Sequence, residues 1–353
     1  MSELSDELAE LTRQLCDVRS PVGEEGPLAE RLARQPGAER FGNSVVLGSA
    51  TGKKPAVVLF GHIDTVPVQD GDFPARRAAG RVHGRGASDM KGAIAVMLTL
   101  WERLDRAHLP IELVCVFYDR EEGPYEQSGL GPLLEARVDL RRASLGLCLE
   151  PTDLALQLGC CGSMHATLSF LGRSAHSARP WQGENAIHKA GALLTHLGSQ
   201  APREVRVGEL LYREVMTATR IEGFTGRNVV PARCDLNLNF RFAPGRTVED
   251  AEREVMALAR RFGATAAVTD RAPAAPAILD NPLLQEFRAV TAAPIEAKQA
   301  WTDVAQLARV GIPAANFGPG EQAQAHQGGE SCPEPALERA HAMLERFLRE
   351  AVP

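Results

Sequence analysis

Short apolar runs alternate with segments of helical periodicity along much of the chain. The continuous apolar runs, which predict strands, occupy residues 56–60, 111–118, 143–149 and 313–317. Apolar residues recur at helical spacing over residues 91–105, 184–199, 247–262 and 336–351, and also near the N-terminus. Because the strand runs do not alternate with polar residues, they are typical of a sheet that helices cover on both faces.

The segment 163–271 follows a different pattern. Its predicted strands are at 163–172, 212–223, 232–243 and 264–270, and its predicted helices are at 184–198 and 247–263. This βαββαβ order is that of a ferredoxin-like α+β domain. In the third strand apolar side chains alternate strictly at positions 234, 236, 238, 240 and 242, so one face of this sheet should be buried and the other polar.

The chain is therefore expected to form two domains, since 353 residues exceed the size at which one core keeps growing. Residues 1–162 and 272–353 would build a larger α/β domain with a central mixed sheet flanked by helices. Residues 163–271 would form the inserted α+β domain, with a Pro/Ala-rich return linker at 271–277.

Composition and charge exclude several classes of partner. The net charge is only -6 and lysine and arginine are scattered, so we expect no nucleic acid partner. The N-terminal segment lacks the pattern of a signal peptide, and the longest apolar run is shorter than the roughly 20 residues of a membrane helix. Seven cysteines, with Cys160 and Cys161 adjacent, fit a reducing cytoplasm better than a disulfide framework. The adjacent pair is either a thiol pair or, as we favour, two small buried residues.

Ionisable residues gather where the predicted strands end. His62 and Asp64 follow the first strand and lie two apart, so they point to one side, where Asp64 could hold the second imidazole nitrogen. Asp119, Glu121 and Glu122 follow the second strand. The carboxyl ends of strands in open α/β sheets are where sites form.

Three further candidates come from other parts of the chain. Asp89 lies in a glycine-rich turn before a predicted helix, where a helix N-cap is the simpler interpretation. Glu150 ends the third strand, and His326 lies late in the chain. Any one of these carboxylates alone would be expected on the solvated surface.

Together these residues predict a metal centre, because crowded carboxylates repel one another unless a cation lies among them. Five candidates supply imidazole and carboxylate ligands with three formal negative charges: His62, Asp89, Glu122, Glu150 and His326. Two zinc ions and one hydroxide would balance this charge, and zinc accepts both ligand types. The sequence contains no GxSxG elbow, P-loop or HExxH motif that would indicate another mechanism.

The motifs GHIDTVP, GRGASDMKG, the paired Glu121 and Glu122, LEPT and the late Ala-His pair occur in this order along the chain. In this respect the sequence resembles the co-catalytic zinc deacylases and exopeptidases, a family that includes aminoacylases, acetylornithine deacetylases and succinyl-diaminopimelate desuccinylases. The resemblance covers nearly the whole chain. It implies a zinc-exopeptidase-like catalytic domain, an inserted lid that mediates homodimerisation, and hydrolysis of the amide of a small N-acyl amino acid.

The resemblance also implies a role for each candidate. Asp89 would bridge two zinc ions, for which cobalt or manganese could substitute. His62 and Glu150 would complete one site, and Glu122 and His326 the other. Glu121 would be the general base, and Asp64 would orient His62.

In the lid, His176 matches the histidine that stabilises the oxyanion in the partner subunit's site, although a histidine that caps a loop is the simpler interpretation. The resemblance assigns substrate binding to Asn228, Arg241, Arg179, Trp301 and Thr302. For Arg241, a surface ion pair is an equal alternative.

Segments such as 172–194, 228–246 and 300–321 look most like succinyl-diaminopimelate desuccinylases of the actinobacterial type. Some positions depart from that pattern, among them Gln306 and the stretch 327–332 after the last histidine. The departures bear on substrate recognition. The alternatives are therefore another deacylase or a dipeptidase, such as an acetylornithine deacetylase or a carboxypeptidase, and, from a different class, a non-catalytic ligand-binding homologue.

Overall fold

The computed structural model describes residues 2–223 and 226–351, which form two compact units. Unit 1 comprises Met1–Gly159, Ala277–Glu296 and Thr302–Pro353, and unit 2 comprises Cys160–Pro276 and Ala297–Trp301.

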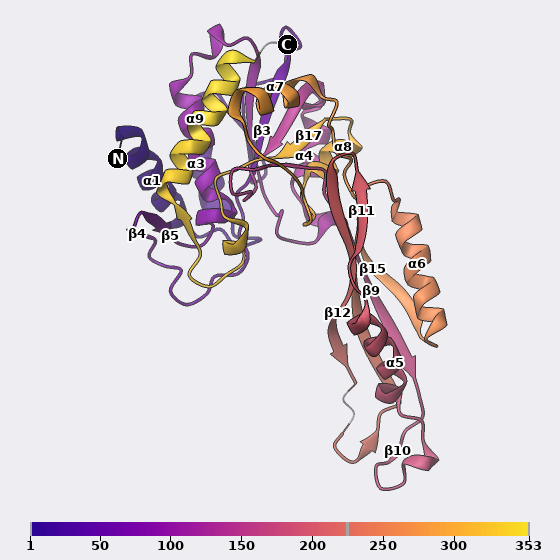
Figure 1. The fold of residues 1–353 in the computed structure, drawn as a ribbon. Helices are drawn as coiled ribbons and strands as arrows, with labels where there is room; N and C mark the ends of the chain where they lie inside the picture. Colours follow the sequence, from indigo (N-terminus) through magenta and orange to yellow (C-terminus); the bar gives the residue numbers. More distant parts are fainter. Residues whose placement is uncertain (1, 224–225, 352–353) are drawn as a thin grey trace. The chain divides into compact units, whose positions relative to one another are not determined.

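Unit 1 is built on a mixed sheet (Figure 1). Across the sheet its strands run in the order β1 (Ala38–Phe41), β2 (Ser44–Leu47), β6 (Glu112–Tyr118), β3 (Ala56–His62), β7 (Ala143–Cys148), β17 (Ala314–Asn316), β8 (Leu156–Leu158) and β16 (Ile295–Ala297). The four central strands β6, β3, β7 and β17 are parallel, whereas β2 and β8 pair with their neighbours antiparallel. The predicted mixed sheet is thus confirmed. A smaller sheet has the order β18 (Ser331–Pro333), β5 (Arg81–His83) and β4 (Arg76–Ala78).

Helices flank this sheet. They are α1 (Glu3–Cys16), α2 (Gly26–Leu32), α3 (Gly92–Arg103), α4 (Leu130–Ala136), α7 (Pro282–Thr291), α8 (Val304–Arg309) and α9 (Glu334–Glu350). Helices α1, α3 and α9 pack side by side, and α3 also contacts β3 and β6 (Figure 1). All seven residues of β3 are buried. This burial is what the unbroken apolar runs predicted, because a strand covered on one face only would alternate.

Unit 2 has the predicted βαββαβ order. Its elements are β9 (Gly162–Leu171), α5 (Ala186–Ser199), β12 (Leu210–Glu222), β14 (Arg233–Phe242), α6 (Val248–Arg261) and β15 (Thr265–Ala272). The strands pair antiparallel in the order β12, β14, β9, β15. The alternating residues of β14, from Cys234 to Phe242, are buried in one core cluster with residues of α5 and α6.

Two features of unit 2 differ from the prediction. An edge strand, β11 (Arg203–Val207), pairs with β12, and two short strands, β10 (Ala175–His176) and β13 (Val229–Val230), pair with each other. Residues 297–301 group with unit 2 rather than with the larger domain. The reason is local bonding, because Gln299 Nε2 donates to the Leu211 oxygen and Trp301 Nε1 to the Pro273 oxygen.

Among the described residues, the helices are all too short or too polar to cross a bilayer.

Candidate metal centre

Parallel pairing brings His62 and the paired glutamates to the same edge of the sheet. In the register of β3 and β6, His62 lies beside Tyr118, so Glu121 and Glu122 follow where β3 also ends. Only 1% of His62 is exposed. The histidine is therefore held within the fold at the carboxyl edge, where the sequence predicted a site.

The imidazole of His62 is oriented by the backbone of Asp64. Its Nδ1 lies 3.0 Å from the Asp64 carbonyl oxygen and 3.7 Å from the nearer carboxylate oxygen of the same residue. A carbonyl can only accept, so Nδ1 carries the hydrogen and Nε2 is the nitrogen that could bind a metal ion.

The carboxylate of Asp64 instead holds the turn after β6. It accepts hydrogen bonds from the backbone N–H groups of Glu121 (3.1 Å) and Glu122 (2.9 Å). Asp64 is fully buried, and burial raises the pKa of its carboxyl group against the lowering effect of His62 and these N–H donors. Asp64 thus fixes the positions of both glutamates.

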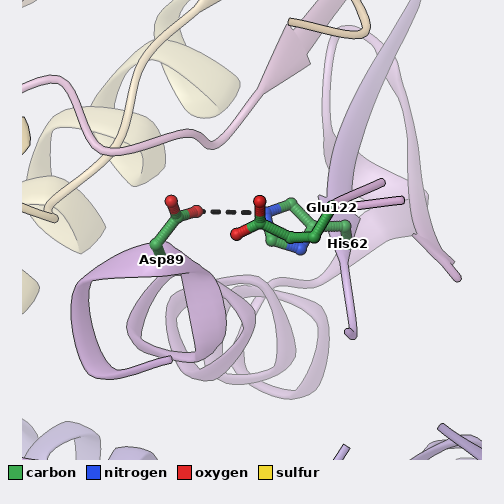
Figure 2. A group of neighbouring side chains, drawn as sticks. All are labelled: His62, Asp89 and Glu122. Atoms are coloured by element: carbon green, nitrogen blue, oxygen red, sulfur yellow. Dashed lines mark hydrogen bonds and ion pairs between the residues drawn. The ribbon is translucent and has the colours of Figure 1, made fainter. Parts of the chain in front are cut away.

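Asp89 lies in the turn Ala87–Lys91 that precedes α3. The N-cap residue of α3 is Lys91, and the backbone of Asp89 is not helical (φ -124°, ψ 90°). The simpler interpretation of Asp89 as a helix N-cap is therefore wrong. Its Oδ1 lies 3.0 Å from Nε2 of His62 (Figure 2).

One ligand atom from each of His62, Asp89 and Glu122 lies within 4.8 Å of the others (Figure 2). His326 adds a fourth donor, since its Nε2 is 3.0 Å from Glu122 Oε2 and 3.7 Å from Asp89 Oδ2. Ligands about 2.1 Å from a tetrahedral zinc ion are roughly 3.4 Å apart. The spacing and the imidazole and carboxylate chemistry of these donors therefore fit an ion of this kind.

Mutual repulsion marks this group of side chains. Burial raises the pKa of Glu122, and the charge of Asp89 raises it further, although the hydrogen bond with His326 opposes both effects. Burial lowers the pKa of His62, but its hydrogen bond with Asp89 and the charges of Asp64 and Asp89 outweigh burial and raise the pKa well above its usual value. The site concentrates negative charge that a bound cation would neutralise.

Glu121 and Glu150 lie within electrostatic reach of each other. Burial and then the charge of Glu150 raise the pKa of Glu121 well above its usual value. Glu150 follows β7 and is 6% exposed. It lies outside the group formed by His62, Asp89 and Glu122.

The remaining predicted residues are divided between the units. Thr302 is buried in unit 1, beside the buried Asp303, to which Gln306 donates a hydrogen bond. Burial raises the pKa of Asp303 to about 6, against the lowering effect of its hydrogen bonds. The other predicted substrate-binding residues and His176 all lie in unit 2.

In unit 2 the structure brings His176 and Asn228 together. His176 of β10 pairs with Val229 of β13, and Ser177 N–H donates to the Asn228 oxygen. Arg179 is in the same loop, where its N–H donates to the His176 oxygen. The side chain of His176 caps its own loop, because its Nδ1 accepts a hydrogen bond from the Ala178 N–H (3.0 Å). His176 is nevertheless exposed.

Arg241 lies in β14 of the five-stranded sheet, which is separate from the β10–β13 pair, and is opposite Ser163 of β9, whereas Arg233 at the start of β14 lies opposite Leu171. The eight residue steps from Arg233 to Arg241 span about 27 Å of strand, so the two ends of β14 are far apart. The Nε of Arg241 donates to Asn239 Oδ1 (3.0 Å), and burial lowers the pKa of its guanidinium. The alternative, a surface ion pair of Arg241, is not observed among the described residues, while its contact with substrate stays a prediction.

Sequence reasoning missed Glu330, a buried carboxylate that contacts the Asp89 turn. The only signal was its position four residues after His326, in a stretch that departs from the family pattern.

Comparison with known proteins identifies the family of this chain. Residues 58–350 match the model of peptidase family M20/M25/M40. The chain is 36% identical to the putative succinyl-diaminopimelate desuccinylase DapE of Mycobacterium tuberculosis, with 99% of both chains covered. It is 35% identical to the succinyl-diaminopimelate desuccinylase of Corynebacterium glutamicum, covering 96% of this chain and 95% of that one.

The fold is also that of a solved member of the family. An M20 family metallo-carboxypeptidase of Sulfolobus solfataricus superposes with a TM-score of 0.75 at 16% identity, with 99% of each chain covered. The chain belongs to peptidase family M20/M25/M40 and is a metal-dependent hydrolase.

Proposed function

We propose that this protein is a succinyl-diaminopimelate desuccinylase, which hydrolyses N-succinyl-LL-2,6-diaminopimelate to LL-2,6-diaminopimelate and succinate in the biosynthesis of diaminopimelate and lysine. The observation that carries the proposal is full-length similarity to two proteins with this name, together with a metal-binding group of the right composition. The presence of both the metal-binding group and Glu121 argues against a non-catalytic ligand-binding homologue.

We propose that the metal centre holds two zinc ions, with cobalt or manganese as substitutes. Asp89 would bridge them, His62 and Glu150 would bind one, and Glu122 and His326 the other. Bound zinc supplies Lewis acidity for the amide carbonyl and lowers the pKa of water. The spacing among His62, Asp89, Glu122 and His326 supports this assignment.

Glu121 would act as the general base. Its backbone N–H is fixed by Asp64, and a carboxylate beside the metal centre can accept a proton from the attacking water. It would take a proton from the attacking water and pass it to the leaving amine. The backbone N–H of Glu122 donates to the other carboxylate oxygen of Asp64. Both glutamates are thus held by their backbone, which leaves their side chains available for different roles.

Arg241 would bind a substrate carboxylate, because a guanidinium can grip a carboxylate through two parallel N–H bonds. Trp301 and Thr302 would complete the substrate site. Asn228 and Arg179, which lie beside His176, would bind substrate in the site of the partner subunit. The succinyl group ends in a carboxylate that an acetyl group lacks, so a cation at this site would favour succinylated substrates.

The test is a substrate panel with zinc-reconstituted protein. We expect kcat/KM for N-succinyl-LL-2,6-diaminopimelate to exceed that for acetylornithine and for dipeptides by at least about 100-fold, because loss of a charged contact leaves a buried partner unpaired. Preference for acetylornithine or a dipeptide would replace this substrate assignment with one of the alternatives. No hydrolysis of any amide would refute the assignment as an enzyme of this type.

We further propose that unit 2 is a lid through which two copies of the chain form a homodimer. Among the described residues of this unit, five large apolar side chains are exposed: Leu171, Trp181, Ile187, Ile221 and Val229. Ile187, Ile221 and Val229 line one hollow. Apolar clusters of this kind favour association. Because His176 and Arg241 are far apart along unit 2, His176 would act in the site of the partner subunit.

Replacing Ile187 and Ile221 together by aspartate should convert the dimer to a monomer, since two charges would be buried without partners at the interface. Light scattering coupled to size-exclusion chromatography measures the mass. Val138→Asp is the matched control, because Val138 is 60% exposed but lies in unit 1. A monomeric wild-type protein, or a double variant that remains dimeric, would contradict the proposed interface.

A further inference from the structure

Glu330 is a buried carboxylate that binds the backbone of the Asp89 turn. Its exposure is 1%. Its Oε1 accepts from the N–H groups of Ser88 and Asp89, and its Oε2 accepts from the N–H of Gly86, each at 2.9 Å. Three backbone donors within residues 86–89 thus converge on one side chain, and one of them belongs to a predicted metal ligand.

A buried ion network anchors this carboxylate. Arg85 Nη1 donates to Glu330 Oε2 (3.0 Å), and Arg85 Nε donates to Asp72 Oδ2 (3.0 Å). Arg85 and Asp72 are at most 1% exposed. Buried charges are costly unless they are paired and hydrogen-bonded, so loss of one member of this network would leave a buried charge of the others without its partner.

The turn itself has little room to adopt another conformation. Gly86 has φ +85°, and a Cβ there would lie 2.9 Å from the Lys91 side chain and 3.0 Å from that of Thr65. The turn is therefore closely packed on one side and bound by Glu330 on the other.

Glu330 also joins the two segments that carry Asp89 and His326. It follows His326 by four residues. Its backbone oxygen accepts from the Gly84 N–H (3.0 Å), and the next residue, Ser331, accepts through its backbone oxygen from Ser88 Oγ (3.0 Å). The segment that follows His326 is thus bonded to the turn that carries Asp89.

We propose that Glu330 is a positioning residue of the metal centre, which sets the place of Asp89 relative to His326 without binding the metal itself. This inference rests on the proposed function, because it assumes that Asp89 and His326 are ligands. Residues that orient metal ligands typically change metal affinity or activity by 10–100-fold when replaced.

Glu330→Gln tests the proposal. The amide keeps one acceptor oxygen, but its NH₂ group replaces the other and cannot accept a hydrogen bond. In one orientation the NH₂ group would face the Gly86 N–H and Arg85, and in the other it would face the N–H groups of Ser88 and Asp89. We expect zinc affinity, measured on the full-length apoprotein by competition with a chelator, to fall at least about 10-fold, with a parallel loss of kcat. Zinc affinity is a readout that does not depend on the substrate.

The matched control is Glu334→Gln. Glu334 is a buried carboxylate at the start of α9, 3% exposed, and Arg77 binds it through Nε (2.9 Å) and Nη2 (3.1 Å). No hydrogen bond joins it to residues 86–89 among the described residues. The Glu334→Gln variant should have lower thermal stability but a zinc affinity within about twofold of wild type, because the geometry of the metal ligands is unchanged.

The outcomes separate the two proposals. If the wild-type chain binds zinc and Glu330→Gln binds it equally well, or if Glu334→Gln weakens zinc binding as much, Glu330 is not a positioning residue. If the wild-type chain binds no zinc, the proposed metal centre itself fails. If Glu330→Gln does not fold, Glu330→Asp is the second test. This variant keeps the charge, but its side chain is one methylene too short to reach all four donors. Wild-type zinc affinity in Glu330→Asp would equally overturn the inference.

Discussion

Glu121→Gln should bind zinc like the wild-type chain and lose turnover by about 10³-fold, within the usual contribution of a general base. The amide has nearly the same shape as the carboxylate but cannot accept the proton of the attacking water. The measurements are kcat with N-succinyl-LL-2,6-diaminopimelate and the zinc content of the purified protein. The position of the residue should not change, because Asp64 binds its backbone N–H rather than its side chain.

The matched control for this variant is Glu126→Gln, an exposed glutamate of the same loop that should keep full activity. Near-normal turnover of Glu121→Gln would show that another group is the base. A loss of zinc in this variant would instead show that Glu121 is a metal ligand.

Glu122→Ala should have the opposite profile and lose metal. We expect its zinc affinity to fall by more than about 100-fold, because the substitution removes a ligand, whereas even residues that only orient ligands contribute 10–100-fold. His326 would also lose the partner that lies 3.0 Å from its Nε2. Chelator competition measures the affinity, and excess zinc should restore part of the activity.

Glu126→Ala serves as the control for this variant and should leave zinc affinity unchanged. Wild-type zinc affinity in Glu122→Ala would remove Glu122 from the metal centre. Identical behaviour of the Glu121 and Glu122 variants would contradict the division of roles between the two adjacent glutamates.

The role of Asp119, the third carboxylate of this segment, could not be assigned from sequence. In the structure it is 2% exposed, accepts from Ser44 Oγ (2.8 Å) and pairs with the neighbouring Arg120 (2.9 Å). It also accepts, through its backbone oxygen, from the Gly129 N–H. Its contacts are therefore those of a residue that stabilises the loop.

Several elements could be read directly from local pattern. The apolar run of β6 and the strict alternation of β14 each correspond to the burial that the structure shows. The edge strand β11 was missed because its residues, Arg203–Val207, are largely exposed and charged, so no apolar period marks it. An edge strand is fixed by its backbone pairing with β12, which leaves little trace in the side chains.

The sequence by itself determined the family, the main alternation of strands and helices and the candidate metal-binding residues, because short motifs and apolar periods are local properties of the chain. Tertiary structure decided how these residues are held. Only the folded chain shows that the Asp64 carboxylate binds the backbone of the two glutamates while its carbonyl orients His62, and that Glu330 binds the Asp89 turn from 241 residues away. Hydrogen bonds between distant segments depend on distance and direction in three dimensions, and no spacing along the chain encodes them.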